Sequence, residues 1–369
     1  MTESFLPAIN GVTNSVLQVL AHLRRRGHEA VVVAPGAGPE EVDGVSVVRL
    51  PALDLAVVDS LPVGVPTPAL RATLEEFRPD VVHLASPFVV GARALTVARR
   101  LGVPTVAVYQ TDVAGFAASY GVGLTARAAW RWTRRLHARA DRTLAPSRWA
   151  VEALAEHGVP RVHRWGRGVD TARFRPGAPG AAALRAELAP RGELLVGYVG
   201  RLAAEKQVRR LAELDGIPGI RLVVVGDGPE RAWLEKRLPD AVFTGQLLGD
   251  ELAAAFASLD VFVHTGEAET FCQTVQEAQA SGVPVVAPAV GGPVDLVDHR
   301  RTGLLHEPGD PPSLRRSVSR LVWDASLRRS LGRNARAEVE GRSWSAMVQE
   351  LVDVHYASVL APRAQRPAA

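Results

Sequence analysis

Two glutamates, Glu269 and Glu277, lie eight residues apart in the stretch GEAETFCQTVQEAQASGVPVVAP and flank the chain's only cysteine, Cys272. A carboxylate just ahead of a helix can accept hydrogen bonds from sugar hydroxyls. A second carboxylate, in the second turn of that helix, is placed to bind a vicinal diol such as a ribose. We therefore predict that both glutamates bind a sugar-containing ligand. The structural alternative is an acidic pair that stabilises the helix dipole.

The residues between the two glutamates predict the start of a helix. Thr270 and Gln273 match a capping box, so we expect the helix to begin at about Phe271, after a strand at 260–265 and the short loop GEAE. The first N–H groups of a helix have no intrahelical acceptor, and they attract anionic oxygen atoms. For Cys272 we expect a small residue at a crowded position, because the sequence shows no nearby base that would activate its thiol.

Two cations follow another predicted strand in VGYVGRLAAEKQV, residues 196–208: Arg201 and Lys206. Arginine suits bidentate contact with phosphate and lysine acts as a point charge, so this pair predicts a diphosphate site. The chain has 43 lysine and arginine residues in total, and only Lys206 and Lys236 are lysines. This rarity favours a specific role for the Lys206 ammonium. Solvated charges at a helix start are the alternative.

Two glycine motifs accompany these groups. In INGVTNSV, residues 9–16, Gly11 comes at the start of a predicted helix, where a missing side chain lets a phosphate or sugar approach. In VGDGPE, Gly226 and Gly228 fit part of a dinucleotide fingerprint, but Arg231 breaks it. The motif therefore argues against NAD binding.

Together these motifs resemble the donor site of retaining glycosyltransferases of family 4, and the resemblance covers nearly the whole chain. GRLAAEK is followed about sixty residues later by ETFCQTVQEAQASGVPVVA, whose two glutamates match the family's E-x7-E motif. The resemblance implies that Arg201 and Lys206 bind the nucleotide diphosphate, Glu277 the ribose and Glu269 the transferred sugar. The other donor-binding residues that it implies are Gly11, Gly226, Phe271, Cys272, Gln273 and Thr274.

More narrowly, TESFLPAINGV, YQTDVAGFA and ETFCQTVQEA are similar to bacterial GDP-mannose-dependent α-mannosyltransferases, including ones that modify glycolipids. This similarity implies a nucleotide-sugar donor and a lipid or glycan acceptor. No acidic metal-binding cluster is evident, so we expect the cations and helix dipoles to stabilise the leaving diphosphate without a metal cofactor.

One residue departs from the family pattern. Gln110 stands where many relatives have a histidine, and glutamine cannot shuttle a proton. The candidate catalytic residues are therefore Glu269 and Asp112, which either takes the acceptor's proton or has a structural role. The leaving phosphate is the other candidate acceptor for that proton.

Other functions stay open at this point. They are a UDP-sugar-dependent enzyme of family 4, a non-catalytic sugar-nucleotide-binding subunit, and a GT-B-fold epimerase. The E-x7-E motif disfavours the epimerase, and the intact donor motif argues against a subunit that only binds.

The composition fits an ordinary globular protein. The 369 residues are 47% apolar and 22% charged, and a chain of this length usually forms two domains. No stretch approaches a membrane span, no signal pattern opens the chain, and one cysteine excludes an internal disulfide. We therefore expect a cytoplasmic protein. The near balance of acidic and basic residues, at a net charge of +4, argues against nucleic-acid binding.

Strand-helix alternation predicts an α/β fold with parallel sheets covered on both faces. The predicted strands are 30–34, 80–85, 104–109, 142–147, 194–200, 220–226, 260–265, 284–288 and 303–307. A Pro- and Gly-rich break at 170–193 separates two halves. We expect two doubly wound, Rossmann-like domains that face each other across a cleft, which is the GT-B fold that the resemblance implies.

The domain boundaries follow from this pattern. They are 1–170 for the N-terminal acceptor-side domain, 171–192 for a linker, 193–342 for the nucleotide-sugar-binding domain, 343–360 for a helix that packs back on the N-terminal domain, and 361–369 for a disordered tail. The last helix is expected to pack through Trp344, Met347, Leu351, Val354 and Val359. Because MTESFLPAING enters directly at a loop, we also expect that a first strand is missing and that translation starts upstream of Met1.

The segment RAAWRWTRRLHARAD, residues 127–141, mixes arginines with Trp130 and Trp132. A basic amphipathic helix of this kind can lie on an anionic membrane surface, which would suit a lipid acceptor at the inner face of the plasma membrane. The alternative is a helix that covers the N-terminal sheet.

Overall fold

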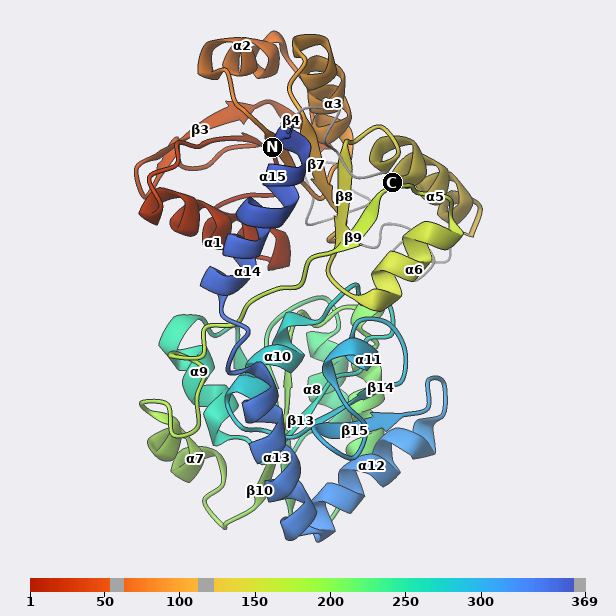
Figure 1. Cartoon of the computed structure of the whole chain (residues 1–369). Coiled ribbons are helices and arrows are strands. Elements are labelled where there is room, and N and C mark those ends of the chain that lie inside the picture. The colour runs from red at the N-terminus through yellow and green to blue at the C-terminus, as the bar shows by residue number, and fades with distance from the viewer. Residues whose placement is uncertain (54–62, 112–122, 362–369) are drawn as a thin grey trace. The chain divides into compact units, whose positions relative to one another are not determined.

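The computed structural model describes residues 1–53, 63–111 and 123–361, without the side chains of 123–126 and 311. These residues form two compact units (Figure 1). Unit 1 comprises 1–53, 63–111, 123–167 and 344–361, and unit 2 comprises 168–343.

Unit 2 is built on a six-stranded parallel sheet. Its strands are β10 (Leu194–Val199), β11 (Ile220–Val225), β12 (Val242–Gly245), β13 (Val261–Val263), β14 (Val285–Pro288) and β15 (Gly303–His306). Their spatial order, β12-β11-β10-β13-β14-β15, is the 3-2-1-4-5-6 order of dinucleotide-binding folds. Ligands of such sheets bind outside the carboxyl ends of the strands where the order reverses, here between β10 and β13.

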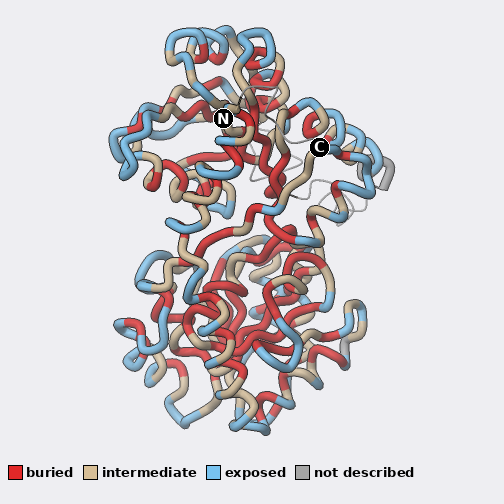
Figure 2. The backbone as a smooth tube through the Cα atoms, in the orientation of Figure 1, coloured by how far each residue is buried: buried red, intermediate tan, exposed pale blue. Residues whose placement is uncertain are grey.

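Both faces of this sheet are buried. Leu195 and Val199 of β10 enter one hydrophobic cluster, and Val196 and Tyr198 enter the other. Figure 2 shows the buried residues concentrated along the strands of unit 2. Side chains that are buried on both faces produce the continuous apolar runs from which all of these strands except β12 were predicted.

Helices cover the sheet of unit 2. They are α7 (Ala181–Leu188), the 3-10 helices η1 (Ala204–Lys206) and η2 (Val208–Leu214), α8 (Arg231–Arg237), α9 (Gly249–Ser258), α10 (Gln273–Ala280), α11 (Pro293–Leu296), α12 (Pro311–Trp323) and α13 (Ala325–Val339). Helix α7 lies inside the predicted linker 171–192 and packs on α9, so this stretch is part of unit 2.

Unit 1 holds two larger sheets and a short two-stranded sheet. The parallel sheet β6-β7-β8-β9 consists of Val82–Ala85, Thr105–Val108, Arg142–Ala145 and Val162–Arg164. The sheet β1-β3-β2 consists of Val31–Pro35, Val45–Leu50 and Glu41–Val42, and β4 (Ala52–Leu53) pairs with β5 (Val63–Gly64). The helices around them are α1 (Gly11–Arg25), α2 (Pro68–Phe77), α3 (Val89–Leu101), α5 (Gly123–His137) and α6 (Arg148–Glu156).

Met1 and Thr2 join the two larger sheets of unit 1. The Thr2 N–H donates to the Val33 carbonyl at 3.1 Å, and the Ala85 N–H donates to the Met1 carbonyl at 2.9 Å. These two residues therefore occupy the position between β1 and β6 where a doubly wound domain has its central strand.

The C-terminal segment belongs to unit 1. It consists of α14 (Trp344–Glu350), the π-helical η3 (Leu351–Tyr356) and α15 (Ala357–Leu360), and α14 packs on α1. The Trp165 indole donates to the Met347 carbonyl at 2.7 Å. Val354 was predicted to face the core but is 50% exposed. The wide turns of a π-helix shift the register that a 3.6-residue period predicts.

Candidate functional site

The residues of the candidate site in unit 2 follow β10 and β13, on either side of the point where the strand order reverses. Close backbone packing brings their loops together. A Cβ on Gly226, which has φ +138°, would lie 2.0 Å from the Gly200 carbonyl oxygen. The Gly200 N–H also donates to the Val225 carbonyl at 3.0 Å. Gly226 therefore acts through close backbone contact beside the loop that carries Arg201 and Lys206.

Lys206 and Glu269 form an ion pair at this edge of the sheet. The Lys206 Nζ lies 2.6 Å from Glu269 Oε1, and the Thr265 hydroxyl donates to the Lys206 carbonyl at 2.7 Å. Burial opposes both charges, but their mutual attraction outweighs it, so the pKa of Lys206 is raised and the pKa of Glu269 is lowered. The structure thus brings together two residues that the sequence assigned to one ligand.

Arg201 also meets a carboxylate, which the sequence interpretation missed. Its guanidinium pairs with Glu205, a buried residue four positions later, on the same loop as Lys206. The Tyr198 hydroxyl donates to the Arg201 carbonyl at 3.1 Å. Both cations predicted for the diphosphate are therefore held in place by carboxylates.

The predicted helix start is wrong by two residues. Helix α10 begins at Gln273, with Cys272 as its N-cap residue at φ 82° and ψ 80°, so Thr270 is not the cap. The N–H groups of the first helical turn therefore begin at Gln273 and Thr274 rather than at Phe271. A left-handed residue cannot continue a right-handed helix, which sets the boundary.

Gly291 and Gly292 hold the loop before α10, and the sequence interpretation did not include them. The Gly292 N–H donates to the Glu269 carbonyl at 2.6 Å. A Cβ on Gly292 would lie 2.4 Å from the Phe271 Cα atom. Phe271 and Cys272 also belong to the hydrophobic core of unit 2, so the core anchors this loop.

His264 is the second residue that the sequence interpretation missed. It follows β13, is 3% exposed, and its Nε2 lies 3.5 Å from Glu269 Oε1. Burial would lower the pKa of His264, but the Cys272 and Glu269 side chains outweigh it and raise that pKa. An imidazole therefore does lie near the Cys272 thiol, which the sequence did not show. The sequence did offer one signal for His264, because it places a histidine at the end of the predicted strand 260–265.

Glu277 lies in α10 and is buried. Burial raises its pKa to about 8, although a hydrogen bond from Gln273 opposes this shift. The Gln273 amide also donates to the Gly168 carbonyl at 3.0 Å. Gln273 therefore links Glu277 to the residue at which unit 2 begins.

In unit 1, Gly11 is the first residue of α1, and the Asn10 side chain caps that helix. Arg167 donates from Nη1 to the Gly11 carbonyl at 3.3 Å and from Nη2 to Gln110 Oε1 at 2.7 Å. The sequence did not indicate this buried arginine. Asp112 lies outside the described residues.

The tryptophans of helix α5 pack against other side chains of unit 1, as expected for a helix that covers the protein rather than a membrane. Trp130 stacks on His157 with ring centroids 3.6 Å apart, and Trp132 meets Phe88 edge-on at 6.3 Å. The outer face of the helix is basic, and its exposed arginines are Arg127, Arg131, Arg134 and Arg135. None of the described helices has the length and apolar character needed to cross a membrane.

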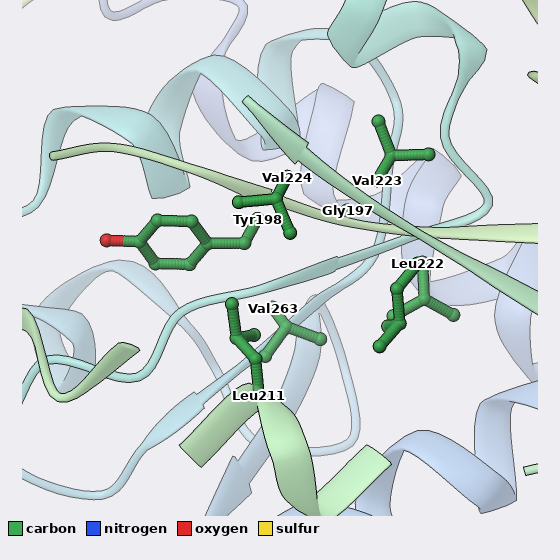
Figure 3. A pocket seen from close by; sticks show the side chains of 8 residues that line it. Gly197, Tyr198, Leu211, Leu222, Val223, Val224 and Val263 are labelled. Carbon is green, nitrogen blue, oxygen red and sulfur yellow. The ribbon is translucent and has the colours of Figure 1, made fainter. Parts of the chain in front are cut away.

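Unit 1 also contains a cavity of about 390 Å³ at the carboxyl ends of β1 and β3. Its lining residues are Ser4, Phe5, Pro7, Ala8, Pro35, Gly36, Ala37, Leu50, Pro51 and Ala52. None of these described lining residues has an ionisable side chain. By contrast, the space beside β10 and β11 in unit 2 (Figure 3), between Tyr198, Leu211 and Val263, has no room for a water molecule. We assign it to the core.

Known proteins match this chain along its length. Residues 9–173 match the family Glycosyltransferase Family 4, and residues 182–338 match Glycosyl transferases group 1. A GDP-mannose-dependent alpha-mannosyltransferase of Mycolicibacterium smegmatis is 56% identical over 100% of this chain and 99% of its own length. One of Mycobacterium tuberculosis is 54% identical over 100% of this chain and 98% of its own length.

Solved structures share the fold. The Anabaena protein HepE in complex with UDP matches with a TM-score of 0.78, at 19% identity, over 96% of this chain and 98% of that chain. This similarity concerns the fold alone. It confirms the predicted α/β fold of GT-B type.

Proposed function

This chain belongs to glycosyltransferase family 4, and from that membership we propose that it transfers mannose from GDP-mannose to a hydroxyl group of a lipid or glycan acceptor, with retention of the α configuration. The observation that carries the proposal is the Lys206–Glu269 pair at the switch point of unit 2. It lies in a chain that is similar over its whole length to enzymes named for this donor.

Each residue of the site has a part in this proposal. Arg201 and Lys206 bind the diphosphate and stabilise the charge that develops as it leaves. Glu277 binds the ribose, while Glu269 and the first N–H groups of α10 bind mannose. Gly226 keeps the loops in contact, and Gly11 of unit 1 leaves space for a phosphate or sugar at the start of α1.

The transfer itself exchanges one bond for another. The acceptor oxygen forms a bond to the anomeric carbon on the face from which GDP leaves, and the bond from that carbon to the phosphate oxygen breaks. The acceptor's proton passes to the leaving phosphate or to Asp112. We propose that no metal cofactor takes part, because two cations already face the position of the diphosphate. Activity that survives treatment with a chelator supports this part.

A donor screen tests the proposal. Purified protein is incubated with labelled GDP-mannose, UDP-glucose or UDP-N-acetylglucosamine and a membrane-lipid extract, and both nucleotide release and label in the lipid fraction are measured. Label from GDP-mannose alone supports the proposal, and label from another donor removes mannose from it. Nucleotide binding without turnover indicates a binding subunit, and a product formed without acceptor indicates an epimerase.

The acceptor is proposed to be a glycolipid that the protein meets at the inner, cytoplasmic face of the plasma membrane. Two features of unit 1 support this: the apolar cavity of about 390 Å³, which suits part of a lipid, and the exposed arginines of α5. Each exposed cation near an anionic bilayer contributes about 1 kcal/mol to binding.

Flotation with anionic vesicles tests the membrane contact. The double variant Arg131→Glu/Arg135→Glu reverses two charges on α5. Arg329→Glu/Arg333→Glu, on exposed positions of α13, makes the same change of net charge in unit 2. We expect only the α5 variant to lose vesicle binding. Equal binding by all three proteins would count against a membrane surface on α5.

A further inference from the structure

Three side chains with different ligand atoms converge in unit 2: His264, Glu269 and Cys272. One ligand atom from each lies within 4.8 Å of the other two. We infer that these residues form a binding site for a soft divalent cation, with Zn²⁺ as its representative, and that the bound cation excludes the sugar-nucleotide donor.

The donor set suits this class of cation. Thiolate and imidazole are ligands that zinc prefers, and a carboxylate often completes three protein ligands around an open fourth position. Zinc bond lengths of about 2.0 to 2.3 Å place tetrahedral ligand atoms about 3.4 to 3.6 Å apart. His264 Nε2 and Glu269 Oε1 already lie 3.5 Å apart. Only the Cys272 sulfur has to move closer, by about 1.4 Å at most, to match this tetrahedral spacing.

The imidazole supplies an independent observation. Within the described part of the chain, neither ring nitrogen of His264 makes a hydrogen bond of normal geometry, and the side chain is 3% exposed. The polar side chains that act on the ring are the other two candidate ligands, Glu269 and Cys272. Buried polar atoms nearly always have a partner, and a metal ion would provide one. The loop that carries the other two ligands is anchored by Gly292, so the three residues keep their spacing.

The contact between Lys206 and Glu269 indicates how a bound cation would exclude the donor. The Lys206 ammonium now contacts Glu269 Oε1 at 2.6 Å, and a divalent cation bound to that carboxylate would repel it. The cation would therefore break the Lys206–Glu269 pair and occupy the position assigned to mannose and the diphosphate. This inhibitory half of the inference depends on the proposed function, whereas cation binding itself does not.

Titration of the metal-free protein with Co²⁺ tests the site. A thiolate bound to Co²⁺ gives a charge-transfer band in the near ultraviolet, and Cys272 is the only thiol in the chain. We expect the band to saturate at one Co²⁺ per protein, to disappear on addition of Zn²⁺, and to persist with Mg²⁺. The inference is overturned if no band appears, or if Mg²⁺ removes the band.

Variants assign the ligands. We expect Cys272→Ser to abolish the band and His264→Gln to weaken Co²⁺ binding by about 10-fold or more, whereas His28→Gln, at an exposed position of unit 1, leaves binding unchanged. Lys206→Met retains all three ligands and removes the competing charge, so it should bind Co²⁺ more tightly than the unchanged protein. Unchanged or weaker binding by Lys206→Met contradicts the site even if a ligand variant fails to fold.

Competition with GDP-mannose tests whether the bound cation excludes the donor, separately from whether the cation binds. If the cation and donor overlap, GDP-mannose raises the Co²⁺ concentration at half-saturation, and Zn²⁺ raises the KM for GDP-mannose. A band that GDP-mannose leaves unaffected overturns the inhibitory half. This readout needs no transfer activity, so it is distinct from failure of the donor screen.

Discussion

At the scale of single residues, the candidate site is a pair of cations, each held by a carboxylate. Lys206 pairs with Glu269, and Arg201 pairs with the buried Glu205. These contacts fix the positions of both positive charges before any ligand arrives. Charges that need no reorganisation stabilise a leaving group more effectively than mobile ones.

Lys206→Met should reduce kcat/KM for GDP-mannose by about 100-fold or more, because it removes one preorganised charge from the leaving diphosphate. Lys236→Met is a matched control, since Lys236 is exposed on α8 and is the only other lysine. Steady-state kinetics with both variants provide the measurement. Similar values for the two variants would rule out a role for Lys206 in the transfer.

Glu277 should make stability depend on pH. Its pKa rises from 4.5 to about 8 through burial, so the folded protein retains a proton that the unfolded chain has already lost in this range. The free energy of unfolding therefore decreases as the pH rises between these two values. Glu277→Gln, which stays neutral, should match the unchanged protein at about pH 5 and exceed its stability by at least about 1 kcal/mol at about pH 8.5.

Denaturant unfolding at both pH values measures this effect, with the exposed Glu187→Gln as control. A Glu277→Gln variant that loses the same stability at both pH values would show that the carboxyl group does not hold its proton in the folded state.

At the scale of elements, glycines decide how closely the loops of unit 2 approach. Gly226→Ala puts a Cβ within 2.0 Å of the Gly200 carbonyl oxygen at φ +138°, whereas Gly216→Ala at φ +70° meets nothing within 4 Å. We expect Gly216→Ala to cost about 1 kcal/mol of unfolding free energy from backbone strain, and Gly226→Ala about 2 kcal/mol more. Thermal unfolding of the two variants provides the comparison, and equal losses would refute the close contact.

The sequence predicts some of these elements better than others. Five of the six strands of unit 2 lie within one or two residues of their predicted ranges, because continuous apolar runs mark strands buried on both faces. The edge strand β12 was not predicted, and its residues are only partly buried. The start of α10 was misplaced because Cys272 has a left-handed backbone, which no local pattern encodes, directly after Phe271, whose backbone packs closely on Gly292.

The sequence also predicts some residues of the candidate site and misses others. Glu269 and Glu277 were found from their spacing, and Lys206 from its rarity. Arg167 was missed because its partners, Gly11 and Gln110, are distant in the sequence. Glu205 and His264 lie only four and five residues from Arg201 and Glu269, but spacing alone does not show that these side chains meet. The sequence contains these residues but not the distances between them.

At the scale of the whole molecule, each hydrophobic cluster of the described residues lies within one unit. The cluster that contains Trp165 also contains Trp344, Val348, Leu351 and Val359 of the C-terminal segment. Unit 1 is therefore completed by residues that follow unit 2 in the chain, although unit 2 has a core of its own.

Leu351→Ala should consequently destabilise unit 1 and leave unit 2 unchanged. Leu351 is fully buried, so its truncation costs about 2 to 5 kcal/mol, whereas Val354→Ala, at a 50% exposed position of the same π-helix, changes stability by less than about 0.5 kcal/mol. Hydrogen exchange measured peptide by peptide should show faster exchange in β6, β7 and β8 of the Leu351→Ala variant, with β10 and β13 as before. If β10 and β13 lose as much protection, the two units unfold as one, and the C-terminal segment stabilises the entire chain rather than unit 1.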